Sequence, residues 1–152
     1  AEGVAAELAR GDTFPGTTLD PTPGFTNPFG VEGFKTIAFE VVDQLGRVPD
    51  RVYVPTGSGD GVYGVWKGFR ELRDRGAADR APRVTACQAA GADSLARAWA
   101  AGRDTVASLP RVATRALSVG EARTGDHALR AVRESAGAAA TATDEAAAAA
   151  AR

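Results

Sequence analysis

A glycine-rich loop in the middle of the chain joins a strand-forming segment to an amphipathic helical segment. Residues 52–54 favour a strand, and residues 61–75 place apolar side chains at helical spacing. Gly57, Gly59 and Gly61 lie at the junction. Glycines there let backbone N–H groups converge, and the helix N-terminus adds partial positive charge. The loop therefore suits a bound phosphate; an ordinary strand-to-helix turn is the alternative, since turns use glycine freely.

The rest of the chain alternates between helical and strand-like segments. We expect helices over 33–45, 61–75, 91–101 and 126–136 and from residue 144 onward, strands over 52–54, 84–89 and 138–142, and an irregular stretch over 102–125 with a β-like run near 115–119. This alternation indicates an α/β fold with an open, mainly parallel sheet flanked by helices. Ligands of such sheets bind beyond the carboxyl ends of the strands, where the glycine loop is expected.

Apolar spacing predicts which side chains face the core of this fold. The residues expected to point inward are Ile37, Val41, Leu45, Val62, Val65, Trp66, Phe69, Leu72, Leu95, Ala98 and Trp99. Three aromatic residues, Phe25, Phe29 and Phe34, are expected to anchor the chain before the first full helix.

The sequence divides into two regions of different composition. Residues 1–30 predict the tail of a helix, over 1–9, followed by an irregular connection rich in glycine, proline, threonine and aspartate. Residues 31–152 predict the α/β domain that carries the glycine loop. Neither end resembles a domain edge, so we expect this domain to be incomplete at both ends and the chain to be part of a larger protein.

The composition argues against several classes of function. With a net charge of −1 the chain has no overall field to recruit nucleic acid or an anionic membrane, and it has no apolar run long enough to span a membrane. No secretory signal is visible in residues 1–9, and we expect a cytoplasmic protein. Cys87 is the only cysteine and His127 the only histidine, so these two alone make neither a disulfide nor a zinc site. We expect Cys87 to be a buried structural thiol and His127 to be exposed.

Two familiar phosphate loops fit the glycines poorly. The nucleoside-triphosphate loop requires lysine after its last glycine, and Val65 stands there, after Gly64. The dinucleotide fingerprint is matched by Gly59, Gly61 and Gly64, but the next strand ends without the acid that holds the ribose. A cofactor phosphate held by backbone amides alone remains as the third interpretation.

Several blocks in order resemble threonine synthases, pyridoxal-phosphate enzymes of the tryptophan-synthase-β fold type. The blocks are Asn27-Pro28, Glu32-Gly-Phe-Lys-Thr-Ile-Ala-Phe-Glu40, Gln44-Leu-Gly46, Pro49-Asp50, Val54-Pro-Thr-Gly-Ser-Gly59, Trp66-Lys-Gly-Phe69, Pro82-Arg83 and Gln88-Ala89, with a looser continuation through 128–135 and 143–145. Together they cover about residues 25–101 closely.

The resemblance implies a cofactor, a reaction and a set of site residues. Gly57, Ser58, Gly59, Asp60 and Gly61 would cradle the phosphate of pyridoxal 5′-phosphate with their N–H groups. The parent enzyme would convert O-phosphohomoserine and water to threonine and phosphate, and homodimerisation of the parent is also implied. Another lyase or dehydratase of the same fold type, acting on a small amino acid, is an alternative, and so is a non-catalytic binding module.

Two features depart from the family pattern. Asp60 stands where glycine is common, so its carboxylate is expected to turn toward solvent or a cation, because it would repel a phosphate dianion. The lysine that forms a Schiff base with the cofactor is expected in a segment that this chain lacks, which leaves no catalytic residue here and an inactive chain on its own. Lys35 is expected to position a turn or assist an anionic ligand, Lys67 to point to solvent, and Glu32 to shape the turn before its helix.

Overall fold

A parallel sheet with helices packed against it forms the part of the chain, residues 27–151, that the computed structural model describes. Its strands are β1 (Arg51–Pro55), β2 (Arg83–Ala89) and β3 (Ala138–Ala142), in the order β1-β2-β3. Both pairs are parallel, with Val52 opposite Val84 and Cys87 opposite Ala140. The predicted α/β class with an open parallel sheet is therefore confirmed.

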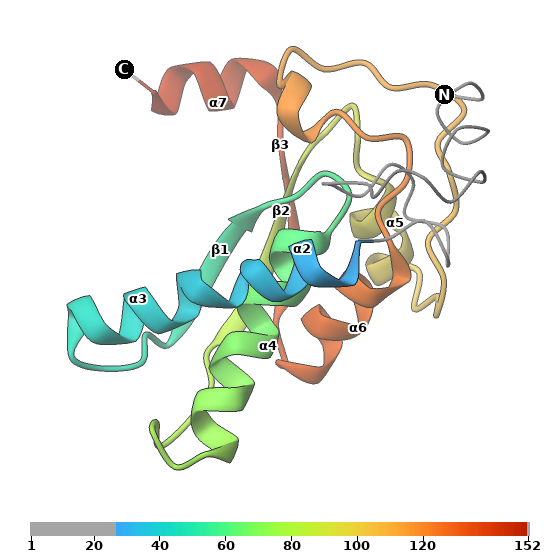
Figure 1. The fold of residues 1–152 in the computed structure, drawn as a ribbon. Coiled ribbons are helices and arrows are strands. Elements are labelled where there is room, and N and C mark those ends of the chain that lie inside the picture. The colour runs from blue at the N-terminus through green and yellow to red at the C-terminus, as the bar shows by residue number, and fades with distance from the viewer. Residues whose placement is uncertain (1–26, 152) are drawn as a thin grey trace, which may run out of the picture.

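Within the described residues, helices lie in both connections between the strands; two others precede β1, and the last follows β3 and projects from its end (Figure 1). They are α2 (Pro28–Gly33), α3 (Lys35–Leu45), α4 (Asp60–Asp74), α5 (Ser94–Ala100), the 3-10 turn η1 (Leu117–Val119), α6 (Asp126–Glu134) and α7 (Asp144–Ala150).

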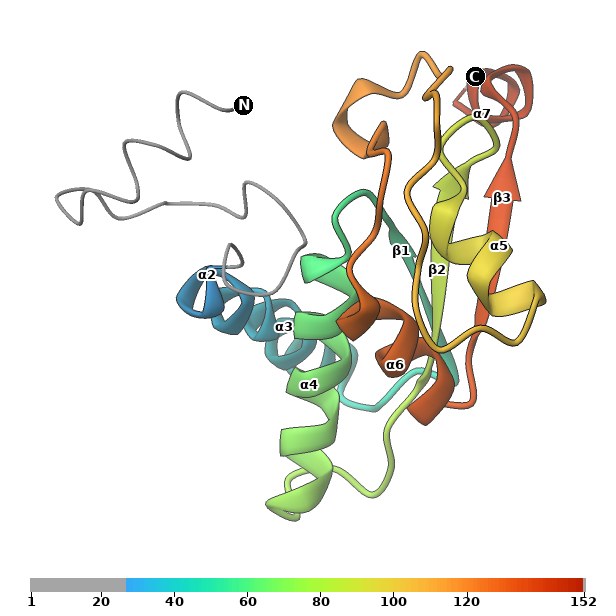
Figure 2. The ribbon, with the colours of Figure 1, turned by 90° about the vertical axis from the view of Figure 1, so that its right-hand side faces the viewer.

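Two apolar clusters hold the helices in place. α4 and α6 lie side by side on one face of the sheet (Figure 2), where Trp66 and Leu129 pack with Val84 of β2 and with Leu95 of α5. The second cluster joins α3 to α4 through buried residues, among them Ala38, Val48, Val65 and Phe69. Trp66, Phe69, Leu95 and Ala98 thus face the core as predicted.

The segment around residue 30 differs from the prediction. The irregular connection was expected to run through residue 30, but α2 already begins at Pro28. Asn27 caps it, since its Oδ1 accepts hydrogen bonds of 3.0 Å from the N–H groups of Phe29 and Gly30, and proline suits the first helical position. The predicted helix over 33–45 is divided at Phe34 into α2 and α3. The predicted helix tail over 1–9 lies outside the described residues.

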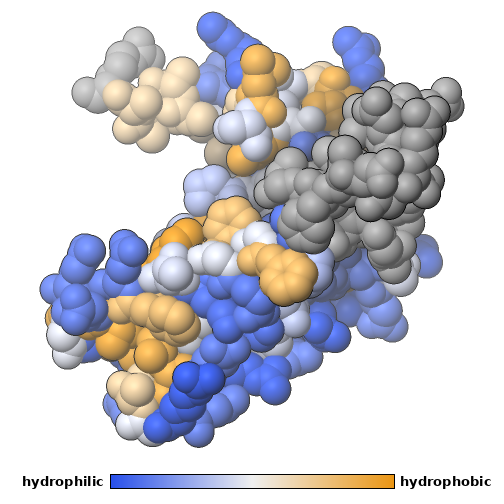
Figure 3. Space-filling model, viewed as in Figure 1, coloured by the Kyte–Doolittle hydropathy of each residue, from blue (hydrophilic) through white to orange (hydrophobic). Residues whose placement is uncertain are grey.

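Several apolar side chains predicted to be inside lie at the surface. Ile37 is 45% exposed, Leu45 54% and Trp99 38%. The prediction for α3 was wrong because the helix contacts α4 through Ala38, leaving its outer side uncovered by the described residues. Phe29 is 73% exposed, whereas Phe25 lies outside the described residues, so the expected anchoring of the chain before α2 stays a prediction. Figure 3 shows hydrophobic residues gathered over α3.

The β-like run near 115–119 is a 3-10 turn rather than a strand. The N–H of Val119 donates to the carbonyl of Ala116, and the N–H of Gly120 donates to that of Leu117. Asp144 holds the preceding backbone, since its carboxylate accepts from the N–H of Arg115 and the hydroxyl of Thr114, both at 2.7 Å. These local bonds favour a turn over a strand.

Candidate functional site

The predicted glycine loop lies at the carboxyl end of β1, at the entrance to α4. Thr56, buried at its start, donates its N–H to the carbonyl of Cys87 and its hydroxyl to that of Val54, at 2.8 and 2.7 Å. These two bonds fix the point at which the chain leaves the sheet. The loop therefore occupies the position at which parallel α/β sheets bind ligands.

Gly59 precedes α4 in a backbone conformation that other residues rarely adopt. Its φ is +100°, in the left-handed region, and a Cβ atom built there would lie 2.5 Å from the Cβ of Ala128 and 2.8 Å from Cγ2 of Thr124. Both the dihedral angle and the close approach of α6 therefore require glycine. The turn brings the backbone of the loop directly against the start of α6.

The carbonyl groups of the loop are held by the segment that precedes α6. The hydroxyl of Thr124 donates to the carbonyl of Gly57 at 2.8 Å, and the N–H of Gly125 donates to the carbonyl of Ser58 at 2.7 Å. A trans peptide places its N–H opposite its C=O. The N–H groups of Ser58 and Gly59 consequently point away from Thr124 and Gly125.

These N–H groups are well placed to bind an anion. Within residues 27–151, no acceptor is hydrogen-bonded to the N–H of Ser58 or of Gly59. α4, which is 15 residues long, begins directly after them and adds the partial positive charge of its N-terminus. Backbone donors converging at a helix start are a common way to hold a phosphate.

Asp60 turns its side chain toward a histidine. The residue is buried, and its Oδ1 lies 3.0 Å from Nε2 of His127. The carboxylate is thus not turned to solvent, and its partner is an imidazole ring, which is a cation only when protonated. The expected exposure of His127 was wrong: its side chain is only 21% exposed, because the ring contacts Asp60 and packs nearly perpendicular to the ring of Tyr63.

The two lysines of the chain are both engaged by carboxylates. Lys35 pairs with Glu32 at 2.5 Å and with Glu71 at 3.0 Å, and Lys67 pairs with Glu32. The hydrogen bonds from Lys35 and Lys67 lower the pKa of Glu32, and those to Glu32 and Glu71 raise the pKa of Lys35. Glu32 thus links α2, α3 and α4, in keeping with its expected structural role. The predicted solvent exposure of Lys67 is corrected to a half-buried ion pair.

Cys87 and the acidic side chains of the described residues are further candidates for a reactive or metal-binding arrangement. Cys87 is half-buried in β2, and desolvation raises the pKa of its thiol, which keeps it protonated. Among residues 27–151, no group of three or more histidine, cysteine or acidic side chains is arranged to hold a metal ion. No helix in that part of the chain is both long and apolar enough to cross a membrane.

The roles of three polar residues around the loop escaped prediction, although Gln88 belongs to one of the sequence blocks. Gln88, Ser94 and Thr124 are buried, and the side chains of Gln88 in β2 and Ser94 in α5 each donate a hydrogen bond to the hydroxyl oxygen of Thr124, in the segment before α6. Thr124 is 36 positions from Gln88 and 30 positions from Ser94 in the sequence. No short motif could have revealed them, because only the fold brings them together.

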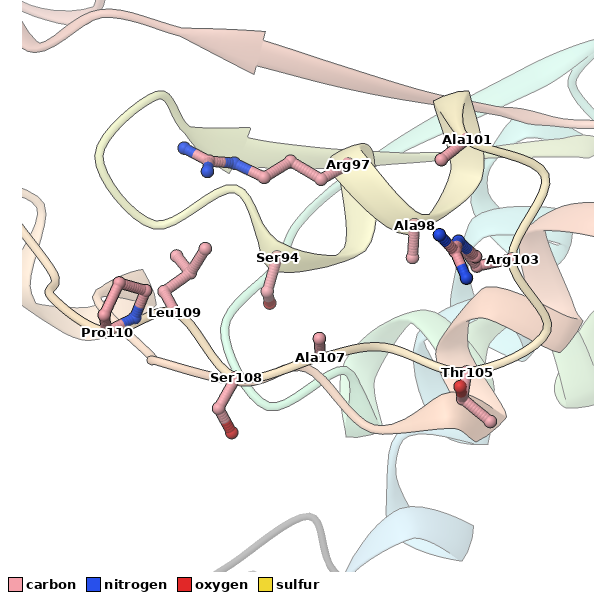
Figure 4. Close-up of a pocket in the computed structure, with 10 residues that line it drawn as sticks. All are labelled: Ser94, Arg97, Ala98, Ala101, Arg103, Thr105, Ala107, Ser108, Leu109 and Pro110. Carbon is pink, nitrogen blue, oxygen red and sulfur yellow. The ribbon is translucent and has the colours of Figure 1, made fainter.

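A cavity of about 480 Å³ lies beside this polar group, between α5 and the extended segment over 103–110 (Figure 4). Ser94 and Ala98 face Ala107 across it. Two arginines line it, and one of them, Arg97, is paired with Asp93 at 2.8 Å. None of the predicted loop residues lines this cavity, so it is separate from the loop.

Comparison with known proteins shows which family the chain belongs to. Residues 2–152 match the family described as pyridoxal-phosphate dependent enzymes. The threonine synthase of Methanosarcina acetivorans is 38% identical over 122 residues, which are 78% of this chain and 30% of that protein. The threonine synthase of Methanocaldococcus jannaschii is 39% identical over the same number of residues and the same shares. The chain thus spans about 30% of the length of these curated relatives.

A solved structure shows the same fold. The processed form of threonine deaminase isoform 2 from Solanum lycopersicum has a TM-score of 0.67 at 22% identity, covering 91% of this chain and 34% of that one. At this identity the likeness concerns the fold alone. The match over residues 2–152 is what shows that the chain belongs to the family of pyridoxal-phosphate-dependent enzymes, whose cofactor is pyridoxal 5′-phosphate.

Proposed function

We propose that the intact protein is a threonine-synthase-like lyase that converts O-phosphohomoserine and water to threonine and phosphate. The identity of 38–39% to two threonine synthases supports this assignment, together with the ordered sequence blocks around the glycine loop. This chain alone would be inactive, because its loop would hold the cofactor's phosphate while both of its lysines are paired with Glu32.

The observation that carries the proposal is the orientation of the loop peptides. The carbonyls of Gly57 and Ser58 are held on one side, so the N–H groups of Ser58 and Gly59 are presented on the other. Backbone donors of this kind fit the phosphate of pyridoxal 5′-phosphate. We assign the loop Gly57, Ser58, Gly59, Asp60 and Gly61 to this phosphate.

The two lysine side chains near α4 form ion pairs and are not placed to bind the cofactor covalently. Lys35 and Lys67 are the only lysines in the chain, and each is ion-paired with Glu32. An amine that forms a covalent bond to a cofactor must be free to lose its proton, and the raised pKa of Lys35 opposes this. When bound, the cofactor supplies the electron sink for carbanion chemistry, while this part of the protein binds and orients its phosphate.

The proposal extends to the organisation of the protein. Residues 31–152 would form the phosphate-binding part of a larger α/β domain, and residues 1–30 the connection that precedes it. The substrate would be a small amino acid derivative, the parent a homodimer, and the location the cytoplasm; these three points rest on the family resemblance and on composition.

Turnover by the intact protein tests the assignment. With pyridoxal 5′-phosphate and O-phosphohomoserine, we expect equal molar amounts of threonine and inorganic phosphate. Formation of a 2-oxo acid from threonine or serine, with O-phosphohomoserine untouched, would instead identify a dehydratase of the same fold type. Cofactor binding with no turnover of any of these amino acids would indicate the non-catalytic binding module.

A further inference from the structure

We propose that Thr124 is a positioning residue whose hydroxyl fixes the phosphate loop in its anion-binding orientation. The inference rests on the proposed role of the loop. Thr124 is fully buried, and its Oγ1 donates to the carbonyl of Gly57 at 2.8 Å. Thr124 lies outside the sequence blocks that mark the family resemblance, and it is not itself part of the loop.

The surrounding hydrogen bonds determine where the hydroxyl hydrogen of Thr124 points. Oε1 of Gln88 accepts from the N–H of Ala96 at 2.9 Å, so its amide nitrogen is the group that faces Thr124. This nitrogen donates to Oγ1 of Thr124 at 2.9 Å, and the Ser94 hydroxyl donates to the same oxygen at 3.3 Å. The only hydrogen on Oγ1 is therefore available for the carbonyl of Gly57.

The same hydroxyl is itself held by the body of the protein. The N–H of Thr124 donates to Oγ of Ser94 at 3.0 Å, which fixes the backbone as well as the side chain. Gln88 belongs to β2 and Ser94 to α5. Through Thr124, the loop is therefore connected by hydrogen bonds to the sheet and to a neighbouring helix. Buried hydrogen-bond groups with every partner in place favour one orientation strongly, because an unpaired member is costly.

The position of the carbonyl decides where the next N–H points. With the Gly57 carbonyl held by Thr124, the peptide that follows presents the N–H of Ser58 on the opposite side. The peptide after it is held by the neighbouring residue, since the N–H of Gly125 donates to the carbonyl of Ser58 at 2.7 Å. The Thr124 hydroxyl and the Gly125 N–H therefore hold the two peptides that we assign to the phosphate.

The affinity of the intact protein for pyridoxal 5′-phosphate, divided by its affinity for pyridoxal, isolates the contribution of the phosphate. Thr124→Val keeps the shape of the side chain and removes the hydroxyl, so we expect this ratio to fall about tenfold, which is about 1.4 kcal/mol. Thr124→Ser restores the hydroxyl and should keep the ratio within about threefold of the wild type. Equilibrium titration followed by tryptophan fluorescence measures both affinities.

A second buried threonine provides the matched control. Thr85 on β2 is 2% exposed and accepts a hydrogen bond from Arg51 at 3.2 Å, away from the loop. Thr85→Val should lower the melting temperature without changing the affinity ratio. A purely structural role for Thr124 would give the same pattern for Thr124→Val, and that result would overturn the inference.

A further pair covers the case in which Thr124→Val does not fold. Thr124→Ser and Thr124→Cys differ only in hydroxyl against thiol, and a thiol is the weaker donor. A lower ratio for cysteine than for serine supports the positioning role, and equal ratios overturn it. Failure of the wild-type protein to turn over O-phosphohomoserine would overturn the proposed substrate and leave the affinity ratios unaffected.

Discussion

The carboxylate of Asp60 and the imidazole of His127 join the first turns of α4 and α6, with 3.0 Å between Oδ1 and Nε2. The two residues are 67 positions apart, and both helices begin at the glycine loop or at the segment that holds it. The pair thus directs a negative charge away from the loop peptides and fastens the two helix starts together.

A double-mutant cycle on this pair should show direct coupling. Asp60→Asn and His127→Gln each remove one partner of this contact, and we expect their effects on the free energy of unfolding to differ from additivity by about 1 kcal/mol. Urea unfolding of the intact protein, of the two single variants and of the double variant measures this coupling energy. The cycle of Asp60→Asn with Arg130→Gln serves as the control, because Arg130 contacts Tyr63 and Glu134. Equal coupling in both cycles would contradict the direct contact.

Gly59 should tolerate no side chain. Gly59→Ala combines a left-handed backbone with a Cβ that would lie 2.5 Å from Ala128, so we expect a loss of about 3 kcal/mol in the free energy of unfolding. Gly46→Ala is the matched control, since φ there is +62° and nothing lies within 4 Å of the added Cβ. Its expected loss is about 1 kcal/mol, from the backbone alone. Similar losses at both positions, measured by denaturant unfolding, would show that the contact with α6 is not tight.

Local signals in the sequence were sufficient for most of the fold. Strand-forming residues at 52–54 and 84–89, with amphipathic residues between them, predict β1, α4 and β2, and their alternation predicts parallel pairing. The α2 helix was missed although Asn27-Pro28 is a helix-start signal, because the surrounding glycine and proline residues favour an irregular connection. Such competing signals are resolved by packing, here of Val31 and Phe34 against α4.

Part of the candidate site could be predicted from neighbouring residues in the sequence, and part depends on contacts between distant residues. Glycine spacing after a strand is local, so the loop could be assigned a phosphate-binding role from sequence. The contacts of Thr124 and His127 with the loop are not local, because each spans 67 positions. Apolar spacing along α3 also failed to identify the exposed side, since spacing defines a stripe without saying what covers it.

The ion pairs of Glu32 should support stability at neutral pH and be lost in acid. Hydrogen bonds from Lys35 and Lys67 lower the pKa of Glu32 below its ordinary value of 4.5. A carboxyl whose pKa is lowered by folding contributes its stability above the ordinary pKa and loses it as the pH falls through the lowered value. Glu32→Gln should therefore reduce the free energy of unfolding at pH 7 by a few tenths to about 1 kcal/mol, because solvent screens the partly exposed pair.

The pH profile of unfolding between pH 7 and pH 3 measures this contribution. The difference between wild type and Glu32→Gln should shrink below about pH 4.5 as the carboxyl becomes protonated. Glu40→Gln, on the exposed side of α3, is the control, since Glu40 makes no ion pair with a described residue. A constant difference between wild type and Glu32→Gln across the acid range would rule out the ion pairs as its source.

The isolated 152-residue chain should self-associate through the outer side of α2 and α3. Phe29, Ile37 and Leu45 are 73%, 45% and 54% exposed there, and clustered apolar side chains of this kind associate in water (Figure 3). Ile37→Lys with Leu45→Lys should shift the chain toward monomer in gel filtration with light scattering. Gln44→Lys adds a positive charge to the same helix at an exposed polar position, and it should leave association unchanged. A sharp monomer peak and a cooperative thermal transition for the wild-type chain would show that this surface is stable in water on its own.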